Sequence, residues 1–273
     1  VCSACCYLAF GKIAQSFGIF KYAIDRGSAS PNIKTLGGKQ NMGRIVAISG
    51  GDLSSTRPLN LHAIQLSGKT NPNVLFVGTA SGDADGYITS IEKEYENLGC
   101  QVKSLCLVTK SYRNEEVDTL LSWADIIYVG GGDTVSMMLV WKQHGLDEKL
   151  KEIYRKDTAV LTGLSAGAIC WFHCGHSDNE SFHDNEGWPY CWADGMLNFF
   201  DYAFCPHYNE AGRESFDGML KEKELTGLAM ENDTAFVENN GNQYFIKSNS
   251  SAKAFEIRYK NGLMEKKPIE FLS

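Results

Sequence analysis

The sequence has no apolar run close to the roughly 20 residues that a membrane span requires. It also has no excess of positive charge: 26 Lys and Arg residues stand against 33 Asp and Glu residues, which gives a net charge of −7. Nucleic acids and anionic membranes both require a basic face on the protein that binds them. We therefore expect neither a nucleic acid nor a membrane as the main partner.

Paired metal-binding cysteines are also missing, although the chain contains nine cysteines. Cys2 and Cys5 form one C-x-x-C motif, but no second pair follows at zinc-site spacing, so a structural zinc is not expected. Four later cysteines are expected to act as small apolar residues in a reducing cytoplasm; these are Cys170, Cys174, Cys191 and Cys205.

The N-terminal segment lacks the signal-peptide pattern, in which basic residues precede an uninterrupted apolar stretch. The chain begins with Val1, and Lys12 interrupts the apolar residues around it. A polar stretch rich in Gly, Ser, Lys and Asn then leads to a first clean strand after Met42. We expect residues 1–41 to be a disordered extension or a non-native leader, and residues 42–273 to form a single α/β domain.

From Met42 onward, short β-branched runs alternate with helical stretches, which indicates a parallel sheet covered by helices. The predicted fold is a three-layer α/β structure with a mostly parallel sheet and short antiparallel strands at its C-terminal edge. Residues 175–195 are polar and turn-rich and are predicted to form a loop. Sheet strands are predicted at 44–49, 73–78, 101–108, 125–129 and 158–162, helices at 59–66, 87–98, 115–123, 134–144 and 147–155, and later strands at 199–205, 228–230, 234–237, 243–246 and 254–259.

Ser165 stands between Gly163 and Gly167, just after the predicted strand 158–162 and before helix-forming residues. A strand, a tight turn and a helix with serine at the apex form the G-x-S-x-G nucleophile elbow. The glycines are needed because the turn is strained and neighbouring backbone passes close by. The alternative is an ordinary serine in a glycine-rich loop.

A serine nucleophile needs a base, usually a histidine that a carboxylate orients. His207 follows the predicted strand 199–205, at the edge of the sheet where Ser165 is expected. Asp178 is the leading candidate for the orienting acid. The alternatives are a loop histidine without function and a solvated loop carboxylate.

A histidine-rich segment offers a competing interpretation as a metal site. Its spacing lacks the H-E-x-x-H pattern of zinc proteases, so we expect no metal. The residues concerned are His173, His176, Asp178, Glu180, His183, Asp184 and Glu186.

A glycine triplet follows the predicted strand 125–129 and precedes a helix. It does not match the G-x-G-x-x-G dinucleotide motif. One amide from Gly131 or Gly132, together with that of Ala166, would make a two-donor oxyanion hole. Asp133, the next residue, is also suited to cap the following helix, which is a structural role.

Together these motifs resemble the serine-peptidase family that contains dipeptidase E and cyanophycinase. The similarity covers essentially all of residues 42–273. It depends on four motifs in this order: Val129-Gly-Gly-Gly132-Asp-Thr, Gly163-Leu-Ser165-Ala-Gly-Ala, Gly175-His-Ser-Asp178 and Pro206-His207-Tyr. Asp178 lies 13 residues beyond Ser165 (178 − 165 = 13), which favours this family over the α/β-hydrolases. The resemblance implies a flavodoxin-like or class I glutaminase-like fold.

The resemblance also implies the chemistry. Ser165 would be the nucleophile, His207 the general base and acid, and Asp178 the orienting carboxylate. The amides of Ala166 and of a glycine in the 130–132 turn would bind the oxyanion. The reaction would be acyl transfer through an acyl-enzyme, without a metal or a cofactor.

The implied substrates are short peptides, and cleavage after an N-terminal aspartate would require a cation in the pocket. Between Lys156 and Arg213 the chain contains no Lys or Arg. Arg213, six residues beyond His207 (213 − 207 = 6), is the nearest basic candidate. We expect Arg213 and Asp133 to contact substrate. Acidic and neutral first residues both stay open, as does a surface position for Arg213.

We therefore expect a cytoplasmic serine hydrolase of short peptides, a dipeptidase E-like exopeptidase. One alternative is a non-catalytic member of the same fold that binds a small ligand. Another is a metal-dependent hydrolase that uses the 173–186 segment. A homo-oligomer stays open, because apolar helix faces serve cores and interfaces alike.

Overall fold

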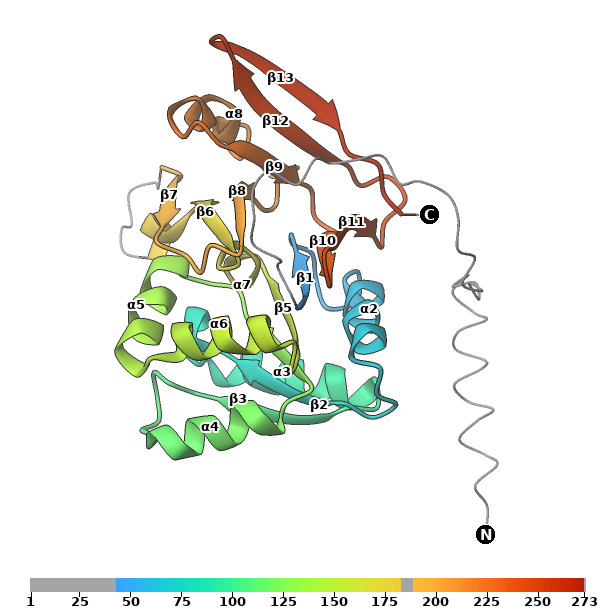
Figure 1. Cartoon of the computed structure of the whole chain (residues 1–273), viewed down its shortest axis with the longest axis vertical. Helices are drawn as coiled ribbons and strands as arrows, with labels where there is room; N and C mark the ends of the chain where they lie inside the picture. Colours follow the sequence, from blue (N-terminus) through green and yellow to red (C-terminus); the bar gives the residue numbers. More distant parts are fainter. Residues whose placement is uncertain (1–42, 183–188, 273) are drawn as a thin grey trace. The chain divides into compact units, whose positions relative to one another are not determined.

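The computed structural model describes residues 43–182 and 189–272 (Figure 1). The expected extension, residues 1–41, lies outside these ranges. Two sheets organise the described residues. The first has seven strands in the order β11-β10-β1-β5-β4-β2-β3. Its strands are β1 (Arg44–Ile48), β2 (Asn73–Val77), β3 (Gln101–Leu105), β4 (Ile126–Val129), β5 (Val160–Leu164), β10 (Thr234–Asn239) and β11 (Asn242–Lys247).

Five neighbouring strands of this sheet, β1, β5, β4, β2 and β3, are parallel, while β10 and β11 pair antiparallel at the β1 edge. This arrangement confirms the predicted mostly parallel sheet with antiparallel C-terminal strands. Strands β1, β2, β4 and β5 are almost entirely buried and rich in β-branched residues, as strands covered on both faces require, whereas Gln101 and Lys103 of the edge strand β3 are exposed.

Helices cover both faces of the first sheet because strand side chains alternate. Val46 and Ile48 pack on one face with α2 and α3, whereas Ile45 and Ala47 pack on the other with α4, α5 and α6. The helices are α2 (Arg57–Ser67), α3 (Asp85–Asn97), α4 (Asn114–Trp123), α5 (Thr134–His144) and α6 (Leu146–Lys156). None of the helices in the described ranges combines the length and apolarity of a membrane span.

The second sheet, which the sequence pattern did not predict, has six strands in the order β13-β12-β9-β8-β6-β7. Stacked Phe172 and Phe204 join it to the first sheet through Phe236. Residues 175–195 were predicted to form a loop, but β6 and β7 occupy the two ends of this range. The strands are β6 (Phe172–Ser177), β7 (Cys191–Asp194), β8 (Phe200–Cys205), β9 (Thr226–Met230), β12 (Ala254–Lys260) and β13 (Leu263–Pro268).

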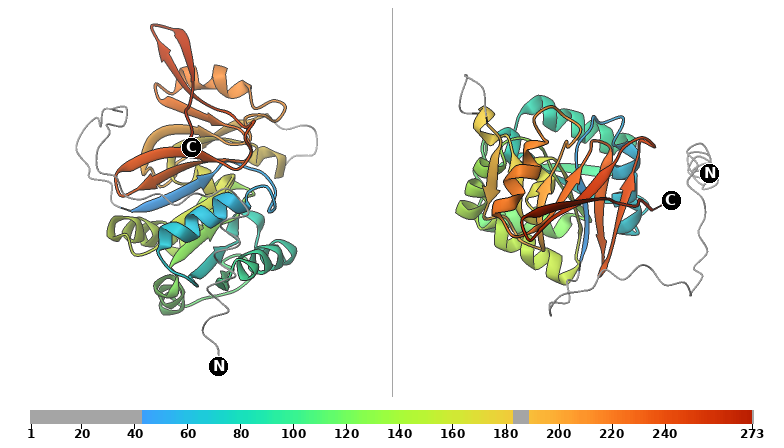
Figure 2. Two further views of the ribbon diagram at one scale, coloured as in Figure 1. Left: turned by 90° about the vertical axis from the view of Figure 1, so that its right-hand side faces the viewer. Right: turned by 90° about the horizontal axis from the view of Figure 1, so that it is seen from above.

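The outer face of the second sheet packs against α8 (Ser215–Met219), through Phe216 and the neighbouring Leu220. Figures 1 and 2 show the hairpin of β12 and β13 extending at the end of this sheet that is farthest from α4 and β3. Every residue of β13 is exposed.

The carboxyl end of β5 lies between those of β1 and β4. Leu164 pairs with Ile48 of β1, and Gly163 pairs with Val129 of β4. The residues that follow these three strands therefore meet at one edge of the sheet, where ligands bind in open α/β sheets. Ser165 follows β5, and the glycine triplet follows β4.

Candidate active site

Ser165 stands at the apex of a strained turn between β5 and α7 (Ala166–Ile169). Its backbone has φ 57° and ψ −111°, a conformation that non-glycine residues rarely adopt and that costs about 1–3 kcal/mol. The surrounding backbone fixes the turn. The Ser165 amide donates to the Ile48 carbonyl at 3.1 Å, and the Ser165 carbonyl accepts from Ala168 at 2.8 Å. Ser165 thus lies in a strained turn between a strand and a helix, and its role as a nucleophile stays a prediction.

The two flanking glycines are required by close backbone contacts. A Cβ atom at Gly163 would lie 2.3 Å from the Gly167 carbonyl oxygen, and one at Gly167 would lie 2.2 Å from that of Val129. Both distances are shorter than any real Cβ contact. The spacing read from the sequence thus reflects packing between β5, α7 and β4.

The two glycines expected at the oxyanion hole occupy different surroundings. A Cβ at Gly131 would lie 3.4 Å from the Ser165 Cβ, so Gly131 borders the serine. Gly132, at φ 137°, packs instead against the Ala80 carbonyl. Ala166 begins α7, and amides in the first turn of a helix have no partner within it. Gly131 and Ala166 therefore flank Ser165.

His207 follows β8 of the second sheet and is attached to the end of β1. Its amide donates to Ser49 Oγ at 3.1 Å, and Ser49 Oγ donates to the Met230 carbonyl at 2.6 Å. The backbone of His207 has φ 54°. Gly50 leaves room for the imidazole, because a Cβ at Gly50 would lie 2.2 Å from His207 Nδ1. The histidine is thus brought to the strand end beside β5.

The imidazole of His207 faces two oxygen acceptors. Its Nδ1 lies 2.7 Å from Asn232 Oδ1 and 3.2 Å from Glu210 Oε1. Asn232 Nδ2 donates to Glu210 Oε1 at 2.9 Å, which fixes the orientation of the amide. Because both neighbours of Nδ1 accept, Nδ1 carries the proton and Nε2 is the basic nitrogen.

Glu210 remains ionised beside this histidine. Hydrogen bonding to His207, and then to Asn232, lowers the pKa of Glu210 to about 2. This arrangement suits a histidine that takes up a proton during catalysis.

Asp178, expected to orient His207, has no hydrogen bond or ion pair with it among the described residues. Its carboxylate lies 3.3 Å from the Arg213 guanidinium. Asp178 follows β6 and His207 follows β8, and these neighbouring parallel strands end at the same edge of the second sheet. Asp178 pairs there with Arg213, whereas Glu210, in the turn after β8, reaches Nδ1 directly. The contacts of His207 therefore point to Glu210 as the orienting carboxylate.

Arg213 is buried, with 2% of its side chain exposed, so it is not a surface residue. Besides the Asp178 pair, it donates to the His176 carbonyl at 2.8 Å and stacks on Tyr190, 4.5 Å from the ring centre. Its Nε has no partner among the described residues. A substrate carboxylate at Arg213 would compete with Asp178.

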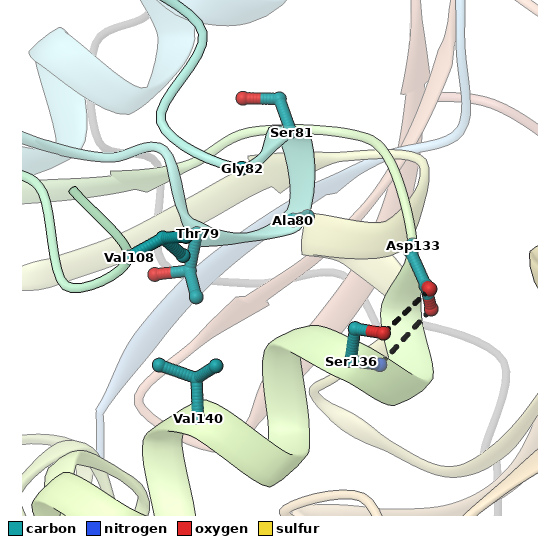
Figure 3. A pocket seen from close by; sticks show the side chains of 8 residues that line it. All are labelled: Thr79, Ala80, Ser81, Gly82, Val108, Asp133, Ser136 and Val140. Atoms are coloured by element: carbon teal, nitrogen blue, oxygen red, sulfur yellow. Dashed lines mark hydrogen bonds between the residues drawn. The ribbon is translucent and has the colours of Figure 1, made fainter. Parts of the chain in front are cut away.

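Asp133 caps α5, as its position before the helix suggested. It accepts from Ser136 N at 3.0 Å and from Ser136 Oγ at 2.6 Å (Figure 3). It also borders a cavity of about 350 Å³. Apart from Asp133 and Ser136, the cavity lining consists of Thr79, Ala80, Ser81, Gly82, Val108 and Val140.

The histidine-rich segment does not form a metal site in the described ranges, where no three His, Cys, Asp or Glu side chains are arranged to hold an ion. His173 is exposed while His176 is buried, because three positions along a strand reverse the side-chain direction. Burial, and then the charge of Arg213, lower the pKa of His176 to about 3. His183, Asp184 and Glu186 lie outside the described residues.

The sequence interpretation missed Glu210, Asn232, Ser49 and Gly50. One signal was available: Glu210 lies three residues after His207, close enough for a turn to join them. The other three come from the ends of β1 and β9, and only the fold brings them to the histidine. In the described part of the chain, Ser165 Oγ makes no hydrogen bond.

Comparisons with known proteins relate the chain to peptidases. The model of Peptidase family S51 matches residues 45–246. YgaJ, an uncharacterized peptidase of Bacillus subtilis, is 31% identical over 223 residues, which are 79% of this chain and 92% of that protein. Peptidase E of Haemophilus influenzae is 24% identical over 172 residues, 62% of this chain and 72% of that protein.

The fold is found in a crystal structure of a peptidase from an acI-B1 actinobacterium, which superposes with a TM-score of 0.63 at 18% identity and covers 85% of this chain and 98% of that one. The resemblance to dipeptidase E-like peptidases is thereby confirmed. The chain belongs to peptidase family S51 and is a serine-type peptidase.

Proposed function

We propose that this enzyme hydrolyses short peptides as a dipeptidase E-like exopeptidase, through an acyl-enzyme on Ser165. The observation that carries the proposal is the strained turn at Ser165, which borders Gly131. Ser165 follows β5, and His207 is attached to the end of the neighbouring strand β1 through Ser49. Haemophilus influenzae Peptidase E, a relative of the chain, supports the peptidase E type of activity.

In the proposed reaction, Ser165 Oγ attacks the scissile carbonyl carbon while His207 Nε2 accepts the hydroxyl proton. The carbonyl oxygen becomes an oxyanion that the amides of Gly131 and Ala166 stabilise. His207 then gives its proton to the leaving nitrogen as the C–N bond breaks. A water molecule attacks the resulting ester, again with His207 as the base, and releases the acid and free Ser165.

The orienting role belongs, in this proposal, to Glu210 together with Asn232. Both accept from Nδ1, which keeps Nε2 basic, and the charge of Glu210 stabilises the imidazolium that forms. Asp178 acts instead by neutralising the buried Arg213.

The preference for the first residue of the substrate is inferred from the ion pair between Arg213 and Asp178. Because Asp178 neutralises this cation, we propose that peptides with a neutral first residue are accepted at least as well as those with aspartate. Asp133 borders the cavity of Figure 3, next to the glycine turn, and is proposed to contact the substrate from there.

Localisation in the cytoplasm is part of the proposal. The six cysteines of the described ranges are free thiols, and five of them are buried. Burial raises the pKa of several of these thiols, for example Cys174 to about 11, so they are unreactive. Such thiols suit a reducing compartment.

The test is hydrolysis of a dipeptide panel by the wild-type protein and by Ser165→Ala. We expect turnover by the wild type, loss of at least about 10³-fold in the variant, and no effect of a chelator. Folded wild-type protein without any turnover would favour a ligand-binding role. Activity that a chelator removes and zinc restores would favour a metal-dependent hydrolase.

A further inference from the structure

The hydroxyl group of Tyr87 accepts a hydrogen bond from the amide of Gly131, which is proposed to bind the oxyanion. Tyr87 belongs to the first turn of α3, which follows β2, and β2 is the neighbour of β4 in the sheet. This topology brings the start of α3 to the glycine turn after β4. The Gly131 amide donates to Tyr87 Oη at 3.3 Å.

The ring of Tyr87 is held in place from two sides. It packs edge-on against Phe76, with ring centres 5.4 Å apart and planes at 76°. On the other side, a Cβ at Gly130 would lie 2.9 Å from the Tyr87 ring, so only glycine permits this packing. The hydroxyl group therefore cannot move far from Gly131 without disturbing Phe76 or the turn.

The chemistry of this hydroxyl suits a hydrogen-bond donor. Burial raises the pKa of Tyr87 above its ordinary value, so the phenol keeps its proton at neutral and mildly alkaline pH. A phenol accepts one hydrogen bond while it donates another. At 3.3 Å its bond from Gly131 is long, and a charged oxygen attracts the same amide more strongly.

We propose that Tyr87 is a further catalytic residue, whose hydroxyl group donates a third hydrogen bond to the oxyanion beside those from Gly131 and Ala166. In the free enzyme the Gly131 amide is satisfied by Tyr87 Oη. When the carbonyl oxygen of the substrate becomes charged, the amide turns to it, and the Tyr87 hydroxyl donates to the same oxygen. No bond to Tyr87 forms or breaks. The inference rests on the proposed serine mechanism.

Tyr87→Phe tests this role, because it removes only the hydroxyl group and keeps the ring against Phe76 and Gly130. Tyr95→Phe is the matched control. Tyr95 lies on the same helix, is buried, and donates to Asn60 Oδ1 at 3.3 Å. Active-site titration with a fluorophosphonate counts intact serine sites, so rates per titrated Ser165 stay comparable even where part of a variant misfolds.

For Tyr87→Phe we expect kcat to fall about 10²-fold, as for removal of one oxyanion donor, with KM changed by less than about threefold. Inhibition by a peptide aldehyde, whose serine adduct carries the same oxygen, is expected to weaken about as much, while product peptide binds unchanged. Tyr95→Phe is expected to stay within about threefold of wild type.

A kcat of Tyr87→Phe equal to or above that of wild type would overturn the inference, and an increase would mean that Tyr87 merely occupies the amide. Equal losses in Tyr87→Phe and Tyr95→Phe would also overturn it, since they would reflect the helix and not the hydroxyl. Wild-type protein that neither reacts with the fluorophosphonate nor cleaves peptides would refute the serine mechanism itself.

Discussion

Glu210 Oε1 lies 3.2 Å from Nδ1 of His207, and the two residues are only three positions apart in the chain. Asn232, from the turn between β9 and β10, bridges them by accepting from the histidine and donating to the carboxylate. The orientation of the imidazole is thus set by a local turn and one distant amide. Asp178, the carboxylate expected from the motif order, pairs with Arg213 instead.

Glu210→Gln is expected to lower kcat/KM by about 10²-fold, because the imidazolium loses its charged partner while Asn232 still orients the ring. KM should change little. Asp178→Asn is the matched comparison, since it also replaces one carboxylate by an amide. Steady-state kinetics on a good dipeptide substrate measure both, and a larger loss in Asp178→Asn than in Glu210→Gln would contradict this assignment.

Asp178→Asn should act mainly on stability. Removal of one partner from a buried pair costs about 3–5 kcal/mol, and the cost here should be smaller because 36% of the Asp178 side chain is exposed. Thermal unfolding is expected to show a lower midpoint for Asp178→Asn than for Glu210→Gln. An unchanged midpoint would mean that Arg213 does not depend on this carboxylate.

Gly50→Ala is expected to impair catalysis more than folding. The new Cβ would lie 2.2 Å from His207 Nδ1 and 2.1 Å from Asn232 Oδ1, so the ring must shift. A displacement of about 1 Å at a catalytic group can cost about 10²-fold in rate. Gly218→Ala in α8 is the control, because open space surrounds its Cβ position. Wild-type kcat in Gly50→Ala would show that the ring is not held there.

His176 should make the protein sensitive to acid. Burial, and then Arg213, lower its pKa to about 3 from an ordinary 6.5, so the unfolded chain binds a proton that the folded chain rejects. Its contribution to stability is therefore complete above pH 6.5 and is lost as the pH falls toward 3.

The check is the unfolding midpoint as a function of pH. Between pH 7 and pH 4, the midpoint of His176→Gln should fall less than that of wild type. His173→Gln, on the exposed face of the same strand, serves as the control. Parallel curves for His176→Gln and wild type would contradict a neutral, buried His176.

The sequence predicted the parallel sheet and the elbow because both leave local signals. Short apolar runs that alternate with helical stretches mark β1 to β5. Gly163 and Gly167 stand where backbone contacts exclude a side chain. The second sheet left a weaker signal. Its strands β6 and β7 carry polar residues such as His176 and Asp194. Their hydrogen-bond and ion-pair partners, Ser215 and Lys223, are distant in the chain, so no local pattern shows these contacts.

The carboxylate at His207 was missed for a related reason. Position along the chain made Asp178 and Glu210 equally available, and only the fold decides which of them reaches Nδ1. Arg213 lies 35 residues after Asp178 (213 − 178 = 35). It is buried, stacks on Tyr190 and pairs with Asp178, and none of these contacts leaves a local signal in the sequence. Sequence motifs therefore predicted that Ser165 and His207 lie at the same sheet edge, but not which carboxylate contacts the histidine.

The most direct test of the serine mechanism is fluorophosphonate labelling followed by peptide mass spectrometry. The account predicts one adduct per molecule, on Ser165, with loss of peptide hydrolysis in step with labelling. It also predicts no adduct in Ser165→Ala. Folded wild-type protein that remains unlabelled, or an adduct on another serine that accompanies the loss of activity, would contradict it.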